Sequence, residues 1–338
     1  MLRIGLIGAG HLGKIHLKCI RAAAKELEFV GFYDTDPTNA AAVAAASGVR
    51  SFADPAELIA AVDIVDVVTP TPSHYALVKQ ALEAGKHVFV EKPLTHTVAE
   101  AAELVKLADE RGLFVQVGHV ERFNPALLAL KDTALRPLFM EAHRLAVFNP
   151  RGTDVSVVLD LMIHDLDIVL HLAQSEVTAV HASGVAVVSH TPDIVNARIE
   201  FANGGVANLT ASRISLKNMR KIRLFQPDAY ISLDLLEKET QVVRLYDADQ
   251  PPTFADDAQV FPLDTARGPR LIHVDSPDVE PVNAIQLELE TFARHIREKR
   301  TPAVSIHDGY RALQLAQRIS DAVAESAARA EATLRANR

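Results

Sequence analysis

The turn that follows the first apolar segment constrains the fold of this chain more than any other feature. Residues 3–7 read RIGLI, an apolar run of strand length, and lead directly into the turn GAGHLG at 8–13 and then a helix-like stretch at 12–24. A strand that enters a helix through glycines at this spacing is typical of the first βα turn of a doubly wound sheet. The fold class is therefore predicted to be α/β.

Strand and helix patterns continue to alternate up to about residue 118. Strand-like runs are expected at 3–7, 29–33, 63–69, 87–90 and 114–118, and helices at 12–24, 39–47, 73–84 and 98–111. Thr97 and Glu100 have the spacing of a capping box, which marks one helix start. Alternation with short links predicts a parallel sheet, and we assign residues 1–123 to an N-terminal Rossmann domain.

The pattern changes after Asn124-Pro125, which is typical of a helix cap and first helical position. Strand-like runs follow at 138–148, 193–201, 206–215, 220–225, 229–236 and 241–245, with a hairpin signal at 203–205. The Pro- and Asp-rich stretch 247–278 is interpreted as loop, and helices are expected at 284–299 and 308–334. Residues 124–338 are thus predicted to form an α+β domain with an open, mostly antiparallel sheet. Apolar residues on both faces of some strands favour a homodimer or homotetramer.

Composition excludes several classes of protein. The 338 residues include one Cys, no Trp and a net charge of −8, which argue against a disulfide scaffold, a CxxC zinc site and a nucleic-acid binder. No apolar run approaches the roughly 18 residues of a membrane span, and the first ten residues are too Gly-rich for a signal peptide. We expect a cytoplasmic protein.

The glycine turn has the context of a dinucleotide-binding site. Gly8, Gly10 and Gly13 let the main chain approach a pyrophosphate, and the helix that starts near His11 and Leu12 supplies N–H groups to it. An acidic residue, Asp34, closes the second strand about 20 residues further on and can bind the ribose hydroxyls. Its carboxylate would repel a 2′-phosphate, so NAD is expected rather than NADP. Residues 69–72, TPTP, follow the third strand and are expected along the cofactor.

A second constellation lies in the stretch VLDLMIHDLD at 158–167. At helical spacing, Asp160, His164, Asp167 and His171 form one polar line on an otherwise apolar helix. Such a line faces either an internal hydrogen-bond network or a ligand cleft. A metal site would need a third ligand at useful local spacing, and none is present, so no metal is expected.

The order GAGHLG, Asp34, TPTPSHY, AGKHVFVEKP and VLDLMIHDLD resembles the Gfo/Idh/MocA oxidoreductases over nearly the whole chain. The resemblance implies an NAD(P)-dependent enzyme that oxidises or reduces sugars and cyclitols, with catalytic residues Lys92, Asp160 and His164. Histidine titrates near neutral pH and suits a general base; which of Lys92 and His164 takes the proton first stays open. The cofactor-binding residues implied are Gly8, Gly10, His11, Leu12, Gly13, Asp34, Thr69, Pro70, Thr71, His74, Glu91, Lys92 and Glu121.

Two further stretches, GHVERFNPA at 118–126 and RGTDVSVVLDLMIHDLD at 151–167, resemble a subgroup that acts at position 3 of UDP-N-acetylglucosamine. That resemblance implies a 3-keto nucleotide sugar made for a partner aminotransferase and for lipid A with amide-linked chains. A diphosphate also requires basic side chains, which the segment 212–221 offers unless it is simply a charged sheet edge. The substrate-binding residues expected are Lys92, Arg122, Asn124, Arg144, Asp160, His164, Arg213, Lys217 and Arg220.

Two alternatives remain open. Another dehydrogenase could act on a free sugar, a cyclitol or a UDP-hexuronic acid. A non-catalytic NAD-binding sensor would need the glycine turn and Asp34, but not Lys92, Asp160 and His164 together.

Overall fold

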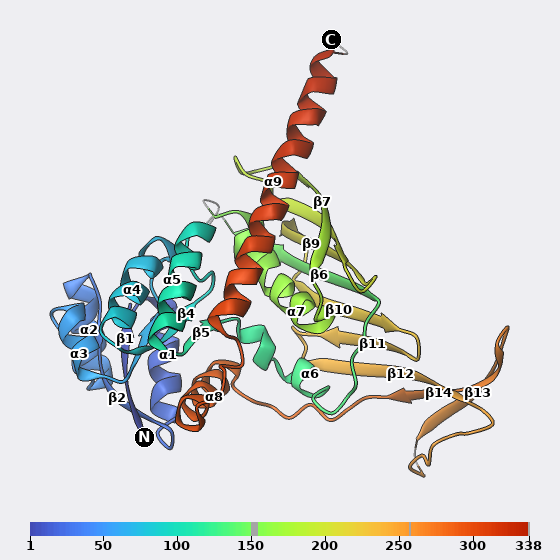
Figure 1. The fold of residues 1–338 in the computed structure, drawn as a ribbon, viewed down its shortest axis with the longest axis horizontal. Helices are drawn as coiled ribbons and strands as arrows, with labels where there is room; N and C mark the ends of the chain where they lie inside the picture. The colour runs from blue at the N-terminus through green and yellow to red at the C-terminus, as the bar shows by residue number, and fades with distance from the viewer. Residues whose placement is uncertain (150–154, 257, 337–338) are drawn as a thin grey trace. The chain divides into compact units, whose positions relative to one another are not determined.

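The computed structural model describes residues 1–149, 155–256 and 258–336. The chain forms two compact units, each made of two segments (Figure 1). The first comprises Met1–Phe123 and Asn283–Gln314, and the second comprises Asn124–Val282 and Leu315–Arg338. The sequence pattern shows the change at 123–124 but gives no sign that 283–314 returns to the first unit.

The first unit has the parallel doubly wound sheet that the alternation predicts, so the N-terminal fold class is confirmed. Its strands, in the order β2-β1-β3-β4-β5, are β1 (Leu2–Ile7), β2 (Leu27–Tyr33), β3 (Ile64–Val67), β4 (His87–Glu91) and β5 (Val115–Gly118). From β1 the chain goes one way to β2 and the other way to β3, which makes the β1–β3 boundary the topological switch point. Ligands bind beyond the carboxyl ends of strands at such a point.

Helices flank this sheet and short 3₁₀ turns follow two of its strands. They are α1 (His11–Ala22), α2 (Pro37–Ser47), α3 (Pro55–Ala61), α4 (His74–Glu83), α5 (Val98–Arg111) and α8 (Ala284–Glu298), with 3₁₀ turns η1 (Thr71–Ser73) and η2 (Val120–Phe123). Helix α3 was not predicted. The predicted capping box of Thr97 and Glu100 is present at the start of α5.

Helix α8 belongs to the first unit because its apolar stripe completes that core. Leu289, Phe292, Ala293 and Ile296 are buried in one cluster with side chains of α1 and the central strands. Phe292 meets Phe89 of β4 edge-on, with ring centroids 6.3 Å apart. Full burial of a Phe is worth about 1.5–3 kcal/mol. The amphipathic period therefore predicts the helix correctly, but the partner of its stripe is a long-range property.

The second unit is built on a nine-stranded sheet in the order β13-β14-β12-β11-β10-β6-β9-β8-β7. Its strands are β6 (Phe139–Val147), β7 (Val177–Val185), β8 (Ile194–Phe201), β9 (Val206–Ser215), β10 (Met219–Gln226), β11 (Ala229–Asp234), β12 (Glu239–Asp247), β13 (Gln259–Thr265) and β14 (Gly268–Asp275). Among the strand pairings of this sheet in the described residues, only β6–β9 is parallel. The mostly antiparallel sheet is thus confirmed.

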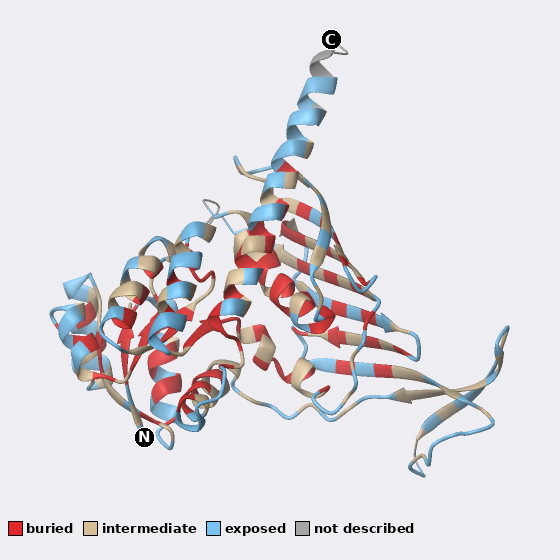
Figure 2. Cartoon of the chain, in the orientation of Figure 1, coloured by how far each residue is buried: buried red, intermediate tan, exposed pale blue. Residues whose placement is uncertain are grey.

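One face of this sheet is covered by α7 (Ile163–Ala173) and by the part of α9 (Ile306–Ala336) that begins at Leu315, while α6 (Pro125–Leu128) is a single short turn. Figure 2 shows the buried residues as a band across the strands and along the covering sides of these helices. The other face keeps an aromatic row, in which Phe139, Phe225 and Tyr230 are neighbours across β6, β10 and β11. Apolar side chains therefore stand on both faces, as the sequence pattern indicated.

The loop predicted at 247–278 is wrong, because β13 and β14 form a hairpin that extends from the end of the sheet (Figure 1). Prolines and aspartates in this stretch were interpreted as loop signals. Pro262 is accommodated because β13 is an edge strand, where a missing N–H breaks no ladder bond. Strand β7 was also missing from the prediction.

Candidate active site

The glycine turn after β1 shows a different steric requirement at each glycine. Gly8 has φ +94°, and a Cβ there would lie 2.5 Å from the Val68 carbonyl oxygen. A Cβ on Gly13 would lie 1.9 Å from the Gly8 carbonyl oxygen, so Gly13 is needed for the close fit of helix to strand. A Cβ on Gly10 would meet nothing within 4 Å. The first and third glycines thus serve the fold, whereas the second borders open space, as expected where a pyrophosphate approaches.

The start of α1 lacks the side chains that commonly satisfy a helix N-terminus. Gly10 is the N-cap residue, no side chain caps the helix, and its first turn, which begins with His11, contains no acidic residue. Main-chain N–H groups and the helix dipole therefore favour an anion at this end. These features fit the diphosphate of a dinucleotide.

Asp34 ties the end of β2 to the glycine turn. Its Oδ2 accepts hydrogen bonds from the Ala9 main-chain N–H (2.7 Å) and from Asn39 Nδ2 (3.1 Å), and its Oδ1 accepts from the Asp36 N–H (2.8 Å). A carboxylate has about four acceptor positions, so capacity is left for a ribose hydroxyl. Asp36 caps the N-terminus of α2, where its side chain accepts from the Thr38 and Asn39 N–H groups.

The segment after β3 is held to the segment after β4 by one buried histidine. Thr69 and Pro70 precede η1, and His74 is the first residue of α4. The His74 ring lies 2.8 Å from the Thr69 carbonyl oxygen through Nε2 and 2.9 Å from the Pro93 carbonyl oxygen through Nδ1. His74 was predicted to bind the cofactor; the structure gives it two main-chain contacts that position both loops.

A buried network of His16, Asp66 and Glu91 adjoins Lys92, and it was not predicted from the sequence. The His16 ring of α1 places Nδ1 3.0 Å from Asp66 Oδ2 and Nε2 3.1 Å from Glu91 Oε1. Asp66 is fully buried in β3, and Glu91 ends β4 directly before Lys92. The available signal was an Asp inside the otherwise apolar strand IVDV, because a charge is rarely buried without a partner.

The remaining residues predicted near the cofactor and substrate follow β5. Glu121 and Arg122 lie in η2, where Glu121 is buried. Asn124 begins the second unit and caps α6: its Oδ1 accepts from the Ala126 N–H, and its Nδ2 donates to the Leu235 carbonyl. These contacts give Asn124 a structural role, and its role toward substrate stays a prediction.

The polar line on the second unit begins in a π-helical turn, η3 (Val158–Met162), rather than in an α-helix. In an α-helix residues four apart are offset by about 40°, since 3.6 residues make a turn. A turn closed by i→i+5 bonds holds more residues, which brings Asp160 and His164 closer to one line. Both side chains are half-buried, Asp167 is buried and His171 is exposed. Turns of this kind are frequent at functional sites.

A buried ion pair fixes this helix to the sheet. Arg144 of β6 donates to Asp165 through Nε (3.0 Å) and through Nη2 (2.8 Å), and both side chains are about 95% buried. Asp165 directly follows His164 in sequence, so this pair anchors the helix next to His164.

The basic segment 212–221 does not form one exposed cluster. Arg213 is buried, donates to the Val155 carbonyl (2.7 Å) and lies 3.8 Å from Asp193. Asp193 also accepts three main-chain hydrogen bonds from residues 187–189, which lower its pKa although burial acts to raise it. Lys217 and Arg220 are exposed. Residues 151–154 of the subgroup stretch lie outside the described residues.

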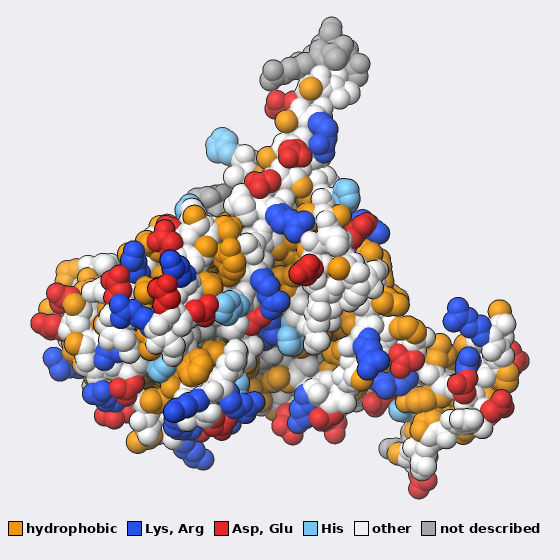
Figure 3. All heavy atoms as spheres, in the orientation of Figure 1, with side chains coloured by type: hydrophobic (Ala, Val, Ile, Leu, Met, Phe, Trp, Pro, Cys, Tyr) orange, Lys and Arg blue, Asp and Glu red, His pale blue; other side chains and the backbone are white. Residues whose placement is uncertain are grey.

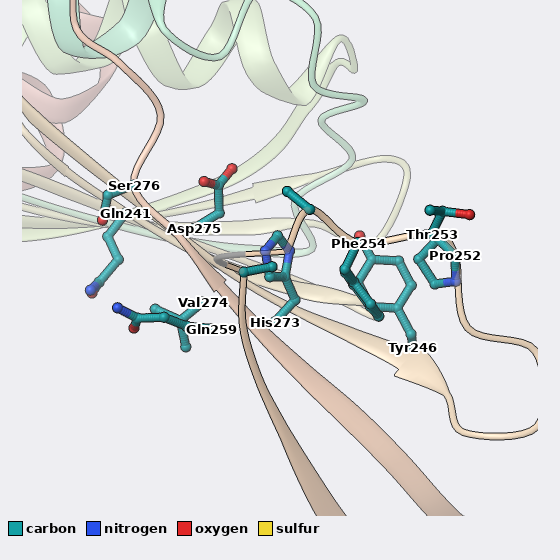
Figure 4. Close-up of a pocket in the computed structure, with 12 residues that line it drawn as sticks. Gln241, Tyr246, Pro252, Thr253, Phe254, Gln259, His273, Val274, Asp275 and Ser276 are labelled. Carbon is teal, nitrogen blue, oxygen red and sulfur yellow. The ribbon is translucent and has the colours of Figure 1, made fainter.

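A cavity of about 620 Å³ lies at the base of the β13–β14 hairpin (Figure 4). The rings of Tyr246, Phe254 and His273 gather there, with centroids 5.2–6.4 Å apart. None of the predicted site residues is among its described lining. On the face shown in Figure 3, basic and acidic side chains are interspersed, unlike the basic stripe of a nucleic-acid-binding surface.

Two kinds of feature are absent from residues 1–149, 155–256 and 258–336. No helix there is long and apolar enough to cross a membrane. No group of three or more His, Cys, Asp or Glu side chains there could hold a metal ion.

Comparison with known proteins agrees with this geometry. Residues 2–119 match the oxidoreductase family with an NAD-binding Rossmann fold, and residues 141–229 match the GFO/IDH/MocA C-terminal domain. The UDP-N-acetylglucosamine 3-dehydrogenase of Acidithiobacillus ferrooxidans is 40% identical over 242 residues, which is 71% of this chain and 76% of that protein. An inositol 2-dehydrogenase of Acidothermus cellulolyticus is 35% identical over 54% of this chain and 56% of its own.

Solved structures give the same result. That of the A. ferrooxidans enzyme superposes with a TM-score of 0.83 at 35% identity, covering 95% of this chain and 97% of the other. A levoglucosan dehydrogenase in complex with NADH and L-sorbose shares the fold, with a TM-score of 0.80 at 23% identity and coverage of 96% and 97%. With the glycine turn, Asp34 and both domain matches in place, the chain belongs to the Gfo/Idh/MocA family of NAD-binding oxidoreductases.

Proposed function

We propose that this protein oxidises the 3-hydroxyl of UDP-N-acetylglucosamine to a ketone with NAD. The observation that carries the proposal is the half-buried pair formed by Asp160, in the π-helical turn, and His164, in the first turn of α7, in a chain that also has the dinucleotide turn. Similarity to the A. ferrooxidans enzyme, at 40% identity and a TM-score of 0.83, supports the choice of substrate.

The reaction removes a hydride from carbon and a proton from oxygen. NAD⁺ accepts the hydride when bound. We assign removal of the hydroxyl proton to His164 and Lys92: an imidazole accepts a proton near neutral pH, and an ammonium group can hydrogen-bond the same oxygen. Asp160, one turn before His164, orients the substrate or the imidazole. Which of His164 and Lys92 receives the proton first is a question for their separate pH–rate profiles.

The structure changes which basic residues we propose for the diphosphate. Arg144 and Arg213 are each paired with a buried carboxylate, so we now assign them to bracing α7 and the 187–193 loop. The exposed Lys217 and Arg220 remain candidates for phosphate contact. Arg220→Ala should raise the KM for a UDP-sugar, whereas Arg223→Ala serves as the matched control, because residues three apart on one strand project to opposite faces of the sheet.

We further propose a homodimer or homotetramer in the cytoplasm. Support comes from the exposed Phe261 and Leu263 on the hairpin and from the aromatic row on the open sheet face, which monomeric proteins rarely leave in water. The 3-keto product would be consumed by an aminotransferase and, in this scheme, would lead to lipid A with amide-linked chains. Light scattering at micromolar concentration should give at least twice the chain mass.

The test is NADH formation by absorbance with NAD⁺ and one candidate substrate at a time. The panel is UDP-N-acetylglucosamine, UDP-N-acetylglucosaminuronate, UDP-glucose, myo-inositol and glucose, with a 3-aminotransferase and glutamate added to remove a 3-keto product. Signal with UDP-N-acetylglucosamine that is lost in Lys92→Ala and His164→Ala supports the proposal. Signal only with myo-inositol, the substrate class named by several relatives at 31–36% identity, would replace the nucleotide sugar with a cyclitol.

A further inference from the structure

The buried network of His16, Asp66 and Glu91 lies in the first unit. Glu91 was predicted to bind the cofactor; the structure places its carboxyl oxygens against His16 and the Lys92 main-chain N–H, and the reaction proposed above gives no step to any of the three. It brings together a helix, α1, and two parallel strands, β3 and β4, at the carboxyl edge where Lys92 follows Glu91. The side chains of His16 and Asp66 are at least 99% buried. Burying three ionisable groups is costly unless they are paired, so the sequence keeps them for a reason other than core packing.

The geometry requires a particular charge on the imidazole. A neutral imidazole has one N–H donor, whereas both nitrogens of an imidazolium donate. Each ring nitrogen of His16 faces a carboxyl oxygen at 3.0–3.1 Å, so when both carboxyl groups are ionised only the imidazolium satisfies both contacts. Burial lowers the pKa of His16, but Asp66 and Glu91 outweigh it and raise that pKa well above its ordinary value.

The carboxylates respond in opposite directions. Full burial raises the pKa of Asp66, against the effect of His16. Burial also acts to raise the pKa of Glu91, but the hydrogen bond and charge of His16, with the charge of Lys92, lower it. The charges of His16 and Asp66 also act on the nearby Cys19. Burial raises the pKa of its thiol.

Room for the Glu91 carboxyl is built into the sheet. Gly118 is the register partner of Glu91 on β5, and a Cβ there would lie 2.8 Å from Glu91 Oε1. On the other side of Lys92, the Pro93 carbonyl contacts the buried His74. The two residues that flank Lys92 are therefore each held by a buried histidine from another element.

We propose that His16 is a positioning residue for Lys92. Through its contact with Glu91 it fixes the last residue of β4, and with it the point and direction in which Lys92 leaves the strand. This inference rests on the proposed role of Lys92 in the reaction. It does not depend on which sugar is oxidised.

The test compares His16→Gln with Glu91→Gln, which removes the charge of the carboxylate partner of His16 and keeps the side-chain volume. His87→Gln is the matched control, since His87 is a partly buried histidine at the opposite end of β4, stacked on Phe114. Misplacing a reacting group by about 1 Å can cost about 10²-fold in rate. We expect both network variants to lose about 10²-fold in kcat while their Kd for NAD⁺, measured by calorimetry, stays within about twofold. The control should keep both values.

The pH profile separates positioning from loss of folding. In His16→Gln the Glu91 carboxyl stays buried without its imidazolium, so its pKa rises and the acid limb of kcat/KM moves to higher pH. Glu91→Gln should show no such limb. A kcat for His16→Gln within threefold of the control, or a loss of NAD⁺ binding as large as the loss of kcat, would overturn the proposal.

A crystal structure of His16→Gln without ligands decides the matter even if no sugar on the panel is oxidised. We expect the Glu91 carboxylate and the Lys92 main chain to leave their wild-type positions. If Lys92 keeps its position, the positioning role is refuted. An inactive wild-type enzyme would instead refute the proposed function alone.

Discussion

Removing one partner of the Arg144–Asp165 pair should destabilise the second unit far more than removing an exposed ion pair. The guanidinium makes two hydrogen bonds of 3.0 and 2.8 Å to the carboxylate, and the side chains are 4% and 5% exposed. Arg144→Met leaves Asp165 as an uncompensated buried charge, which costs about 3–5 kcal/mol. At about 2–4 °C per kcal/mol for a unit of this size, the Tm should fall by about 6–20 °C.

The assay is thermal unfolding followed by calorimetry, with two companions. Arg223→Met removes a pair with Glu141 whose side chains are 44% and 26% exposed, so it should cost less than about 1 kcal/mol. The double variant Arg144→Met/Asp165→Leu removes both charges and should recover most of the loss, because apolar replacement of a whole buried pair is often neutral. A single variant no less stable than the Arg223 control would refute the idea that this pair braces α7.

Three further predictions concern the first unit. Gly10→Ala should keep the wild-type Tm and weaken NAD⁺ binding, measured by calorimetry, about tenfold or more. Gly13→Ala should instead lower the free energy of unfolding by about 1–3 kcal/mol, because its Cβ would overlap the Gly8 carbonyl. Asp34→Ser should raise the NADP⁺/NAD⁺ ratio of kcat/KM about tenfold or more, since the carboxylate that repels a 2′-phosphate is gone; an unchanged ratio would contradict its assignment. Burial acts to raise the pKa of Asp308, but hydrogen bonds from Ser305 and Arg311 lower that pKa below its unfolded-state value. The stabilisation of the fold by the ionised Asp308 is therefore complete above the unfolded-state pKa, and it is lost as pH falls through the lower folded-state pKa. The stability difference between wild type and Asp308→Asn in urea should therefore shrink below about pH 4.

Local patterns predicted the helices and strands of this fold well where apolar residues kept the period of a helix or of a strand over a whole segment. The five parallel strands, the capping box of Thr97 and Glu100, and the strands β8 to β12 of the mostly antiparallel sheet are present as expected. Two features depend on contacts that no local pattern contains. Helix α8 fills the core of the first unit from a position far along the chain, and the β13–β14 hairpin extends through a stretch whose prolines favoured a loop.

The residues of the candidate site also divide into those that local spacing predicts and those that depend on long-range contacts. Spacing predicted the glycine turn, whose steric requirements at Gly8 and Gly13 the structure shows, because such a turn is local; binding of the cofactor by Gly10 and Asp34 stays a prediction. Arg144 and Arg213 were expected to face a phosphate, but their carboxylate partners lie about 20 residues away in sequence and could not be assigned beforehand.

The network beneath Lys92 could not be assembled from sequence because its three members come from different elements. Asp66 alone gave a signal, as a charge within an apolar strand, yet nothing local pointed to His16 as its partner. A polar residue at an apolar position of a parallel strand is therefore the residue whose partner side chain should be sought first.

The central claim is that NAD⁺ receives the hydride from carbon 3 of UDP-N-acetylglucosamine. The most direct measurement uses substrate deuterated at that carbon, with NAD⁺ and a 3-aminotransferase to consume the ketone, and mass spectrometry of the reduced cofactor. The account predicts one deuterium in each NADH formed, and no reduction in His164→Ala. Reduced cofactor without deuterium, or none with the wild-type protein while NAD⁺ binding is intact, would contradict it.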